Sequence, residues 1–180
     1  KSLNFLLSID VPLIKIPSVE IKNFSFLEKC SISKIPIILS TGTAEQEDVD
    51  KALAVLTKNN DEIILLQCTS AYPSKLNEID LNVINSYKKK YDCPIGFSGH
   101  EPGINIPIGA VAIGAKVVEK HVTLNKKMNG THHLASIDME ELGRMIAGIR
   151  EIEKALGSFD KKNYKSENVL VSILGKSLVA

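Results

Sequence analysis

Residues 115–123, with the sequence AKVVEKHVT, decide how the chain folds. They read as a short buried strand whose apolar residues give way to Glu119 and His121, and strand alternation puts these two ionisable side chains on one face. Residues 94–100, with the sequence PIGFSGH, end in the same way, with a serine and then His100 two residues later. Two strands that each deliver a histidine at the carboxyl end predict a metal site.

Apolar strands and helical segments alternate along the rest of the chain. We expect strands over residues 12–16, 36–39, 63–67, 94–97 and 116–121. The expected helices cover residues 2–9, 24–30, 44–59, 81–91, 106–113 and 139–156. Thr43, with Gln46 three residues later, predicts a capping box at the start of the third helix. Asp138 predicts the cap of the last helix, which Gly157 closes.

Strands that are apolar on both faces and alternate with helices predict a parallel sheet with covered faces. Polar residues recur at or just after the strand ends at intervals of 23 to 30 residues, at Lys15, Ser40, Ser70, Ser98 and His121. Each interval is the length of one strand, one helix and two loops, and β/α proteins hold their chemistry at this rim. A TIM-type barrel needs eight such units and about 250 residues. The chain is therefore either a smaller open sheet or the later part of a barrel.

The composition is that of an ordinary globular protein. The 180 residues include 22 Lys and Arg and 21 Asp and Glu, so the net charge of +1 gives no electrostatic argument for nucleic acid or a membrane as a partner. Cys30, Cys68 and Cys93 are an odd number without CxxC spacing, which predicts reduced thiols in a cytoplasmic protein. No apolar run approaches the roughly 20 residues that span a bilayer.

Five long motifs follow one another in the chain: LLQCTSAYP at 65–73, PIGFSGHEPGI at 94–104, GAVAIGAKVVEKHVTL at 109–124, ASIDMEELGRMIAGIREIEKALG at 135–157 and GKSLVA at 175–180. Together they resemble the sialic acid synthase family, which comprises N-acetylneuraminate synthase and relatives that make legionaminic or pseudaminic acid. The resemblance implies an α/β fold, a TIM-type (β/α)8 barrel of which residues 1–158 are the last five units. Residues 159–180 are then a linker toward an antifreeze-like domain, and the first three units belong to a longer natural chain.

The resemblance also implies a metal-dependent transferase of sialic acid biosynthesis. Such enzymes condense phosphoenolpyruvate with an N-acetylmannosamine-type sugar, or its 6-phosphate, to give a nine-carbon 2-keto sugar acid and phosphate. The implied cofactor is Mn²⁺ or Mg²⁺, held by His100 and His121, with Glu119 as a further catalytic carboxylate. Neutral imidazoles are good ligands, and two protein ligands leave positions open for water and a substrate oxygen. We expect the full-length enzyme to be a homodimer in the cytoplasm.

The same resemblance implies substrate-binding roles. The residues that match positions around phosphoenolpyruvate are Lys15, Ser18, Ser40, Ser70 and Ser98. An ammonium group with several hydroxyls suits a phosphate and a carboxylate. Glu20 and Tyr72 match positions on the sugar side. His132 stands where most of the family has an aspartate that contacts the sugar, which leaves the sugar's identity open and makes a third metal ligand an alternative role for His132.

Each assignment also has a structural alternative. A lone histidine on a strand is more often a structural residue than a ligand. Lys15 lies between apolar residues and is costly to bury unpaired, so it either pairs with a carboxylate such as Glu20 or meets a ligand. The serines after the strands can be helix caps. Glu119 can form a salt bridge with Lys15 or Lys116 in the barrel interior.

Two classes of function follow. The first is a synthase, with this chain as the catalytic portion of a longer protein. The second is a non-catalytic partial barrel that needs a partner chain, because five units leave two strand edges and an apolar interior uncovered. Among enzymes the alternative is another phosphoenolpyruvate-condensing synthase, of 3-deoxy sugar acids, but the EKHVTL and GKSLVA motifs favour the sialic acid group. We expect the chain to be inactive alone.

Overall fold

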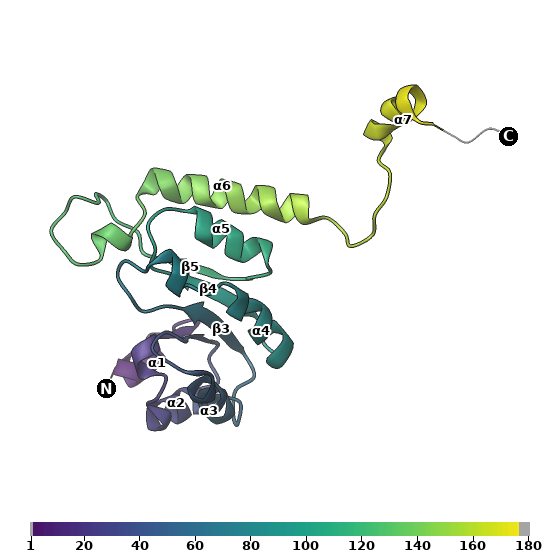
Figure 1. The fold of residues 1–180 in the computed structure, drawn as a ribbon. Helices are drawn as coiled ribbons and strands as arrows, with labels where there is room; N and C mark the ends of the chain where they lie inside the picture. Colours follow the sequence, from purple (N-terminus) through teal and green to yellow (C-terminus); the bar gives the residue numbers. More distant parts are fainter. Residues whose placement is uncertain (1, 177–180) are drawn as a thin grey trace.

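The computed structural model describes residues 2–176, and Figure 1 traces them from an N-terminal helix to a C-terminal helix. Residues 177–180, the end of the GKSLVA motif, lie outside the described residues. Within the described part of the chain, no helix is both long and apolar enough to cross a membrane.

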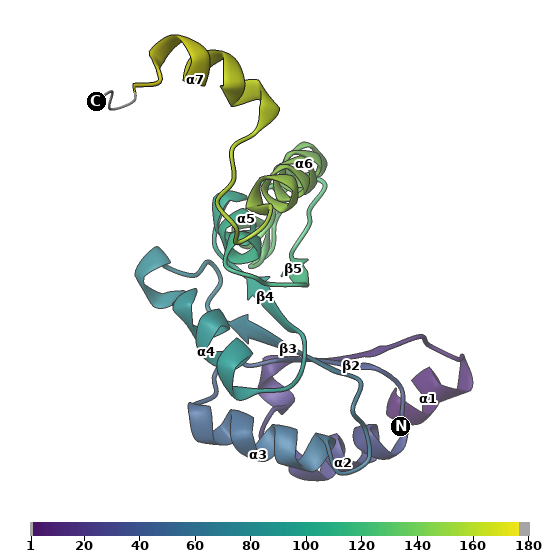
Figure 2. The same ribbon diagram turned by 90° about the vertical axis from the view of Figure 1, so that its right-hand side faces the viewer.

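Five parallel strands form a single sheet in the order β1-β2-β3-β4-β5. They are β1 (Ile14–Ile16), β2 (Ile37–Ser40), β3 (Ile63–Cys68), β4 (Ile95–Gly99) and β5 (Val118–Lys120). Figure 2 shows that the sheet curls around an open concave side, like the wall of half a barrel. The predicted fold, five units of a TIM-type barrel, is confirmed.

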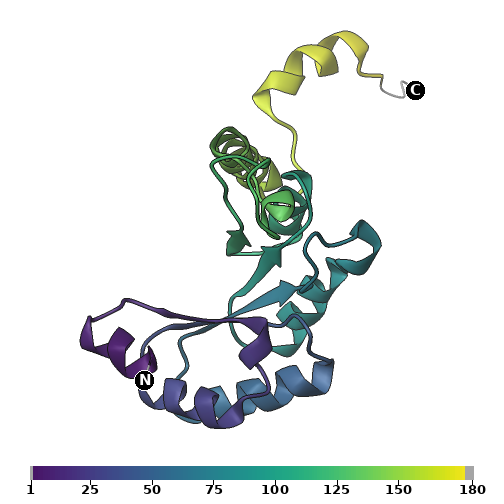
Figure 3. The same cartoon turned by 90° about the vertical axis from the view of Figure 1, so that its left-hand side faces the viewer.

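Helices cover the outer, convex face of the sheet. They are α2 (Phe24–Ile32), α3 (Gln46–Leu56), α4 (Asn82–Lys90) and α5 (Asn105–Ala112), with α6 (Met139–Leu156) packed on α5 (Figure 3). α1 (Ser2–Ser8) precedes β1. The helices from α2 to α6 all lie outside the curve in Figure 2, so the prediction of a sheet with both faces covered is wrong for the concave face. The inner face of a curled sheet is filled by its own side chains instead.

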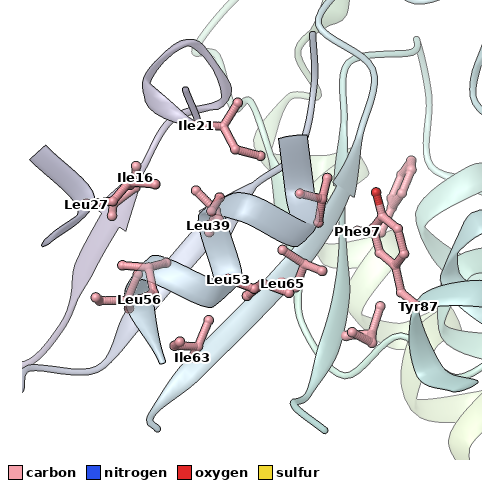
Figure 4. Close-up of a cluster of buried hydrophobic side chains, with 14 of the residues drawn as sticks. Ile16, Ile21, Leu27, Leu39, Leu53, Leu56, Ile63, Leu65, Tyr87 and Phe97 are labelled. Carbon is pink, nitrogen blue, oxygen red and sulfur yellow. The ribbon is translucent and has the colours of Figure 1, made fainter. Parts of the chain in front are cut away.

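The hydrophobic core lies between the sheet and the helices that follow its first strands. Figure 4 shows Ile16, Leu39 and Leu65 of the strands close to Leu27 and Leu56 of the helices, and all five are completely buried. Each such burial contributes roughly 1.5–3 kcal/mol to folding. Alternation turns the intervening residues of each strand to the concave side, where the polar side chains of the strand ends gather.

The two predicted helix caps have different outcomes. Thr43 does not cap α3, because it adopts a left-handed backbone with φ +64° in the turn after β2, whereas an N-cap residue is extended. The cap is Glu45 instead, whose backbone N–H donates to Asp48 Oδ2 at 3.0 Å. Asp138 caps α6 as predicted, and its Oδ1 accepts a hydrogen bond from the backbone N–H of Glu141 at 2.8 Å.

The segment after α6 leaves the body of the molecule. It holds a 3-10 helix, Lys165–Glu167, and α7 (Asn168–Leu174), which stands away from the sheet in Figures 1 and 2. The boundary at residues 158 and 159 follows the end of α6 at Leu156. That this segment is a linker toward a further domain stays a prediction.

Candidate active site

A cavity of about 530 Å³ opens at the carboxyl ends of the strands, on the concave side of the sheet. Every strand contributes to it, directly or through the loop that follows. All but two of the predicted site residues line it: Lys15, Ser18, Ser40, Ser70, Tyr72, Ser98, His100, Glu119 and His121. Its volume lies within the range of pockets that bind small molecules.

Three polar side chains, joined by one hydrogen bond and one salt bridge, cross the cavity. Ser98 Oγ donates to Glu119 Oε1 at 2.7 Å, and Lys15 Nζ lies 3.3 Å from the same oxygen. Lys15 is on the first strand and Glu119 on the last, so their contact spans the concave face. The salt bridge between Lys15 and Glu119, one of the predicted alternatives, is confirmed, and Lys15 does not depend on Glu20 for a partner. Both charged groups remain partly exposed to the cavity.

Ser40 and Ser98 lie in strands, Ser70 lies in a loop, and Ser18 is the first residue of a 3-10 helix whose N-cap is Pro17. None of the four caps a helix, so the capping alternative is wrong for them. Ser18 Oγ accepts from the backbone N–H of Gly42 at 2.9 Å. Ser40 is 2% exposed, and its hydroxyl has no hydrogen-bond partner among residues 2–176. A buried hydroxyl left unpaired costs about 1–3 kcal/mol. Because Ser40 lines the cavity, a ligand oxygen would relieve that cost.

The two histidines that the sequence places at neighbouring strand ends lie side by side. The ring centroids of His100 and His121 are 5.3 Å apart. His100 Nδ1 lies 2.8 Å from the carbonyl oxygen of Thr69, and since a carbonyl only accepts, Nδ1 carries the hydrogen and Nε2 keeps its lone pair. This is the usual arrangement of a metal-binding imidazole. The donor set therefore fits a divalent cation with open coordination positions.

Two protein ligands for such a cation are available among residues 2–176. Within the described residues, no group of three or more His, Cys, Asp or Glu side chains converges closely enough to hold a metal ion. His132 lies beside His121, with ring centroids 5.1 Å apart, but it is exposed and does not line the cavity. The alternative role of His132 as a third ligand is therefore not supported.

The two histidines differ in their electrostatic surroundings. Burial lowers the pKa of His121, and the neighbouring His100 and His132 lower it further. Burial also acts to lower the pKa of His100, but hydrogen bonding to Cys68 and to the Thr69 carbonyl outweighs it, and the net shift is upward. A neutral imidazole, the form that binds metal, is thus easier to keep at His121 than at His100.

The Tyr72 ring packs beside the histidines. Its ring centroid lies 4.1 Å from that of His100, 4.5 Å from His132 and 5.7 Å from His121. Burial raises the pKa of the Tyr72 hydroxyl, with a further contribution from the negative charge of Glu119. The phenol therefore stays protonated and can donate a hydrogen bond.

Glu20 is not brought into the cavity. It ends the 3-10 helix Ser18–Glu20, and its Oε2 accepts from Asn23 Nδ2 at 2.7 Å. Asn23 in turn caps α2 through a hydrogen bond from the backbone N–H of Phe26. Glu20 is thereby tied to the start of a helix, away from the residues that line the pocket.

The sequence analysis missed several lining residues, among them Cys68, Thr43 and Lys120. Cys68 pairs in register with Ser98, and its Sγ accepts a hydrogen bond from Ser18 Oγ at 3.5 Å. Counting back by two from Ser70 along the strand would have found it. Within residues 2–176 all three cysteines are free thiols, as predicted.

Comparisons with known proteins identify the family of the chain. Residues 1–161 match the NeuB family. The chain is 43% identical over 183 residues to the N,N'-diacetyllegionaminic acid synthase of Campylobacter jejuni, covering 100% of this chain and 55% of that protein. It is 39% identical over 180 residues to the human N-acetylneuraminate-9-phosphate synthase, covering 99% and 50%. The chain thus spans about half the length of the curated relatives it matches.

Solved structures show the same fold. A crystal structure of the N-acetylneuraminic acid synthetase from Leptospira borgpetersenii in complex with citrate superposes with a TM-score of 0.87 at 36% identity, covering 95% of this chain and 60% of that one. A truncated 3-deoxy-D-arabino-heptulosonate 7-phosphate synthase from Thermotoga maritima superposes with a TM-score of 0.72 at 20% identity, covering 84% and 62%. At that identity the second likeness concerns the fold alone.

Proposed function

The chain belongs to the NeuB family, and on that premise we propose that the protein it comes from condenses phosphoenolpyruvate with an N-acyl amino sugar to form a nine-carbon 2-keto sugar acid. The observation that carries the proposal is the cavity itself. A lysine, a buried serine hydroxyl with no hydrogen-bond partner in the described part of the chain, and two adjacent imidazoles face one space at the strand ends. These are the groups that an anionic substrate and a polarised aldehyde require.

Lys15 and the serines are the proposed binding site for phosphoenolpyruvate. The ammonium group of Lys15 has three donors, and Glu119 Oε1 and the backbone carbonyl of Ile16, at 3.3 and 3.4 Å, leave it capacity for a phosphate or carboxylate oxygen. The Ser40 hydroxyl adds a donor that is already desolvated. Charge-assisted hydrogen bonds of this kind are stronger than neutral ones. Ser18, Ser70 and Ser98 complete the proposed set.

The proposed reaction joins C3 of phosphoenolpyruvate to the aldehyde carbon of the open-chain sugar. Water adds at C2, the bond between C2 and the phosphate ester oxygen breaks, and inorganic phosphate leaves with that oxygen. His100 and His121 would hold Mn²⁺ or Mg²⁺, and the chemistry that such an ion supplies is polarisation of the aldehyde oxygen. Thr69 orients His100 through Nδ1. Glu119, fixed by Ser98 and Lys15, can accept a hydrogen bond from the attacking water or a substrate hydroxyl.

Tyr72 and His132 are the proposed contacts on the sugar side. Tyr72 lines the cavity. His132 lies in the loop after β5 and packs against the Tyr72 ring. An imidazole offers a hydrogen-bond donor and acceptor where the family resemblance has an acidic group. We therefore expect the choice of sugar to depend on His132.

Two further properties belong to this proposal. Free thiols at Cys30, Cys68 and Cys93 support a location in a reducing compartment, the cytoplasm. Homodimerisation of the full-length protein is implied by the family resemblance.

The test is release of inorganic phosphate by the full-length protein that contains this chain. The protein is incubated with phosphoenolpyruvate, Mn²⁺ and a panel of N-acyl hexosamines, with and without a chelator. We expect phosphate release that requires both an N-acyl mannosamine-type sugar and the metal. Release only with short sugar phosphates that carry no N-acyl group would indicate a 3-deoxy sugar acid synthase instead, and no release with any acceptor would indicate a non-catalytic barrel.

A further inference from the structure

A buried ion pair lies directly behind the two histidines. Lys120 Nζ is 2.8 Å from Glu101 Oε1, and the two side chains are 2% and 0% exposed. Lys120 Nζ also donates to the backbone carbonyl of Glu101. Glu101 follows His100 in the chain and Lys120 precedes His121. One ammonium group therefore joins the two backbone segments that carry the imidazoles.

Stability does not account for this pair. Desolvation takes several kcal/mol per buried ion in proteins, and replacing a buried pair by apolar side chains is often neutral or stabilising. The desolvation cost of Glu101 is only partly offset, because its Oε2 is buried and has no hydrogen-bond partner in the part of the chain that the structure describes. A costly pair placed between two candidate ligands suggests a role in their geometry.

The adjacent backbone is shaped to admit the carboxylate. A Cβ atom on Gly99 would lie 2.7 Å from Glu101 Oε2 and 2.8 Å from Oε1, closer than real Cβ atoms approach other atoms. The same Cβ would lie 2.7 Å from Phe97 Cε1, so the glycine leaves room for the carboxylate and for the Phe97 ring at the end of β4. His100 lies between Gly99 and Glu101 in the chain, so the carboxylate and the backbone that carries this imidazole are placed together.

We propose that the Glu101–Lys120 ion pair is a positioning device that sets the spacing between His100 and His121. The inference rests on the proposed function, since it treats the two imidazoles as ligands of one cation. Glu101 and Lys120 act through the peptide segments and not by contact with the ion. Loss of groups that orient metal ligands commonly weakens metal binding 10- to 100-fold.

The test is Mn²⁺ binding by the full-length protein, measured from the electron paramagnetic resonance signal of free Mn²⁺. The double variant Glu101→Met/Lys120→Met replaces both charged side chains by apolar ones of similar volume. We expect it to unfold at a Tm near that of the wild type and to bind Mn²⁺ roughly 10- to 100-fold more weakly. The control variant Glu47→Met/Lys51→Met removes an exposed pair on α3 with an Nζ–Oε1 distance of 2.7 Å, and should leave Mn²⁺ binding unchanged.

Gly99→Ala is the second test variant, because it keeps both charges while its Cβ displaces the Glu101 carboxylate, together with the edge of the Phe97 ring. We expect it to weaken Mn²⁺ binding as well, and it decides the matter if the double variant does not fold. A folded variant of either kind that binds Mn²⁺ within twofold of the wild type would overturn the inference. Failure of both variants to fold would also overturn it, since the pair would then be purely structural. A wild type that binds no Mn²⁺ would instead refute the metal site in the proposed function.

Discussion

Replacing Lys15 with methionine removes the positive charge at the end of β1 while keeping the length of the side chain. Lys15 is 29% exposed and lies 3.3 Å from Glu119 Oε1. A partly exposed pair of this kind contributes at most about 1 kcal/mol to folding. We therefore expect Lys15→Met to fold normally in the full-length protein.

The expected effect is on the use of phosphoenolpyruvate. A hydrogen bond to a charged group contributes roughly 1.5–3 kcal/mol, and each 1.4 kcal/mol is a factor of ten. If Lys15 binds the phosphate or carboxylate, the KM for phosphoenolpyruvate should rise about 10- to 150-fold. The KM for the sugar should change much less, because the proposed sugar contacts, Tyr72 and His132, pack against each other and the other histidines.

The assay is steady-state phosphate release, with each substrate varied while the other is saturating. Lys22→Met is the matched control, since Lys22 forms a 2.8 Å pair with Asp48 and does not line the cavity. The control should leave both KM values unchanged. A rise in the KM for the sugar alone after Lys15→Met would refute the assignment of Lys15 to phosphoenolpyruvate.

Three further predictions concern the fold and its thiols. Leu65→Ala, at a completely buried position of β3, should lower the free energy of unfolding by about 2–5 kcal/mol in urea titrations. Asp138→Ala removes the 2.8 Å hydrogen bond at the start of α6. It should lower the free energy of unfolding by about 0.5–2 kcal/mol without changing phosphate release. Burial, together with the charge of Glu20, raises the pKa of Cys30 to about 11. Cys30 should therefore react with iodoacetamide at pH 8 more slowly than the half-buried Cys93, and its rate should climb as the pH approaches that value.

Each of these predictions has an outcome that would contradict it. A loss of stability below 1 kcal/mol in Leu65→Ala would mean that β3 is not central to the core. An unchanged Asp138→Ala would mean that the cap is not formed. Equal alkylation of Cys30 and Cys93 at pH 8, judged by peptide mass spectrometry, would mean that Cys30 is accessible.

Much of the fold was predictable because short stretches of sequence determine each strand and helix. The apolar strands, the amphipathic α6 and the Asp138 cap all follow from patterns within a few residues, and the alternation of strands and helices requires parallel pairing. The residues at the strand ends could be placed as well, because the carboxyl ends of parallel strands lie at the same edge of the sheet. The sequence therefore predicted that Ser98, His100, Glu119 and His121 lie together.

Contacts that depend on curvature or on turn geometry were not predictable in this way. The Glu101–Lys120 ion pair joins residues whose partnership depends on how closely β4 and β5 approach. Thr43 has the chemistry of a cap, but the left-handed turn after β2 moves the helix start to Gln46. Glu20 has the chemistry of a site residue, but its bond to Asn23 holds it at the start of α2.

Pulsed electron paramagnetic resonance of the Mn²⁺-loaded full-length protein tests most directly whether His100 and His121 share one cation. We predict nitrogen couplings from two imidazoles in the wild type. Either His100→Ala or His121→Ala should remove one of them and abolish metal-dependent phosphate release while the protein stays folded. A wild-type spectrum without imidazole coupling, or a spectrum that neither substitution changes, would contradict a shared metal site in this cavity.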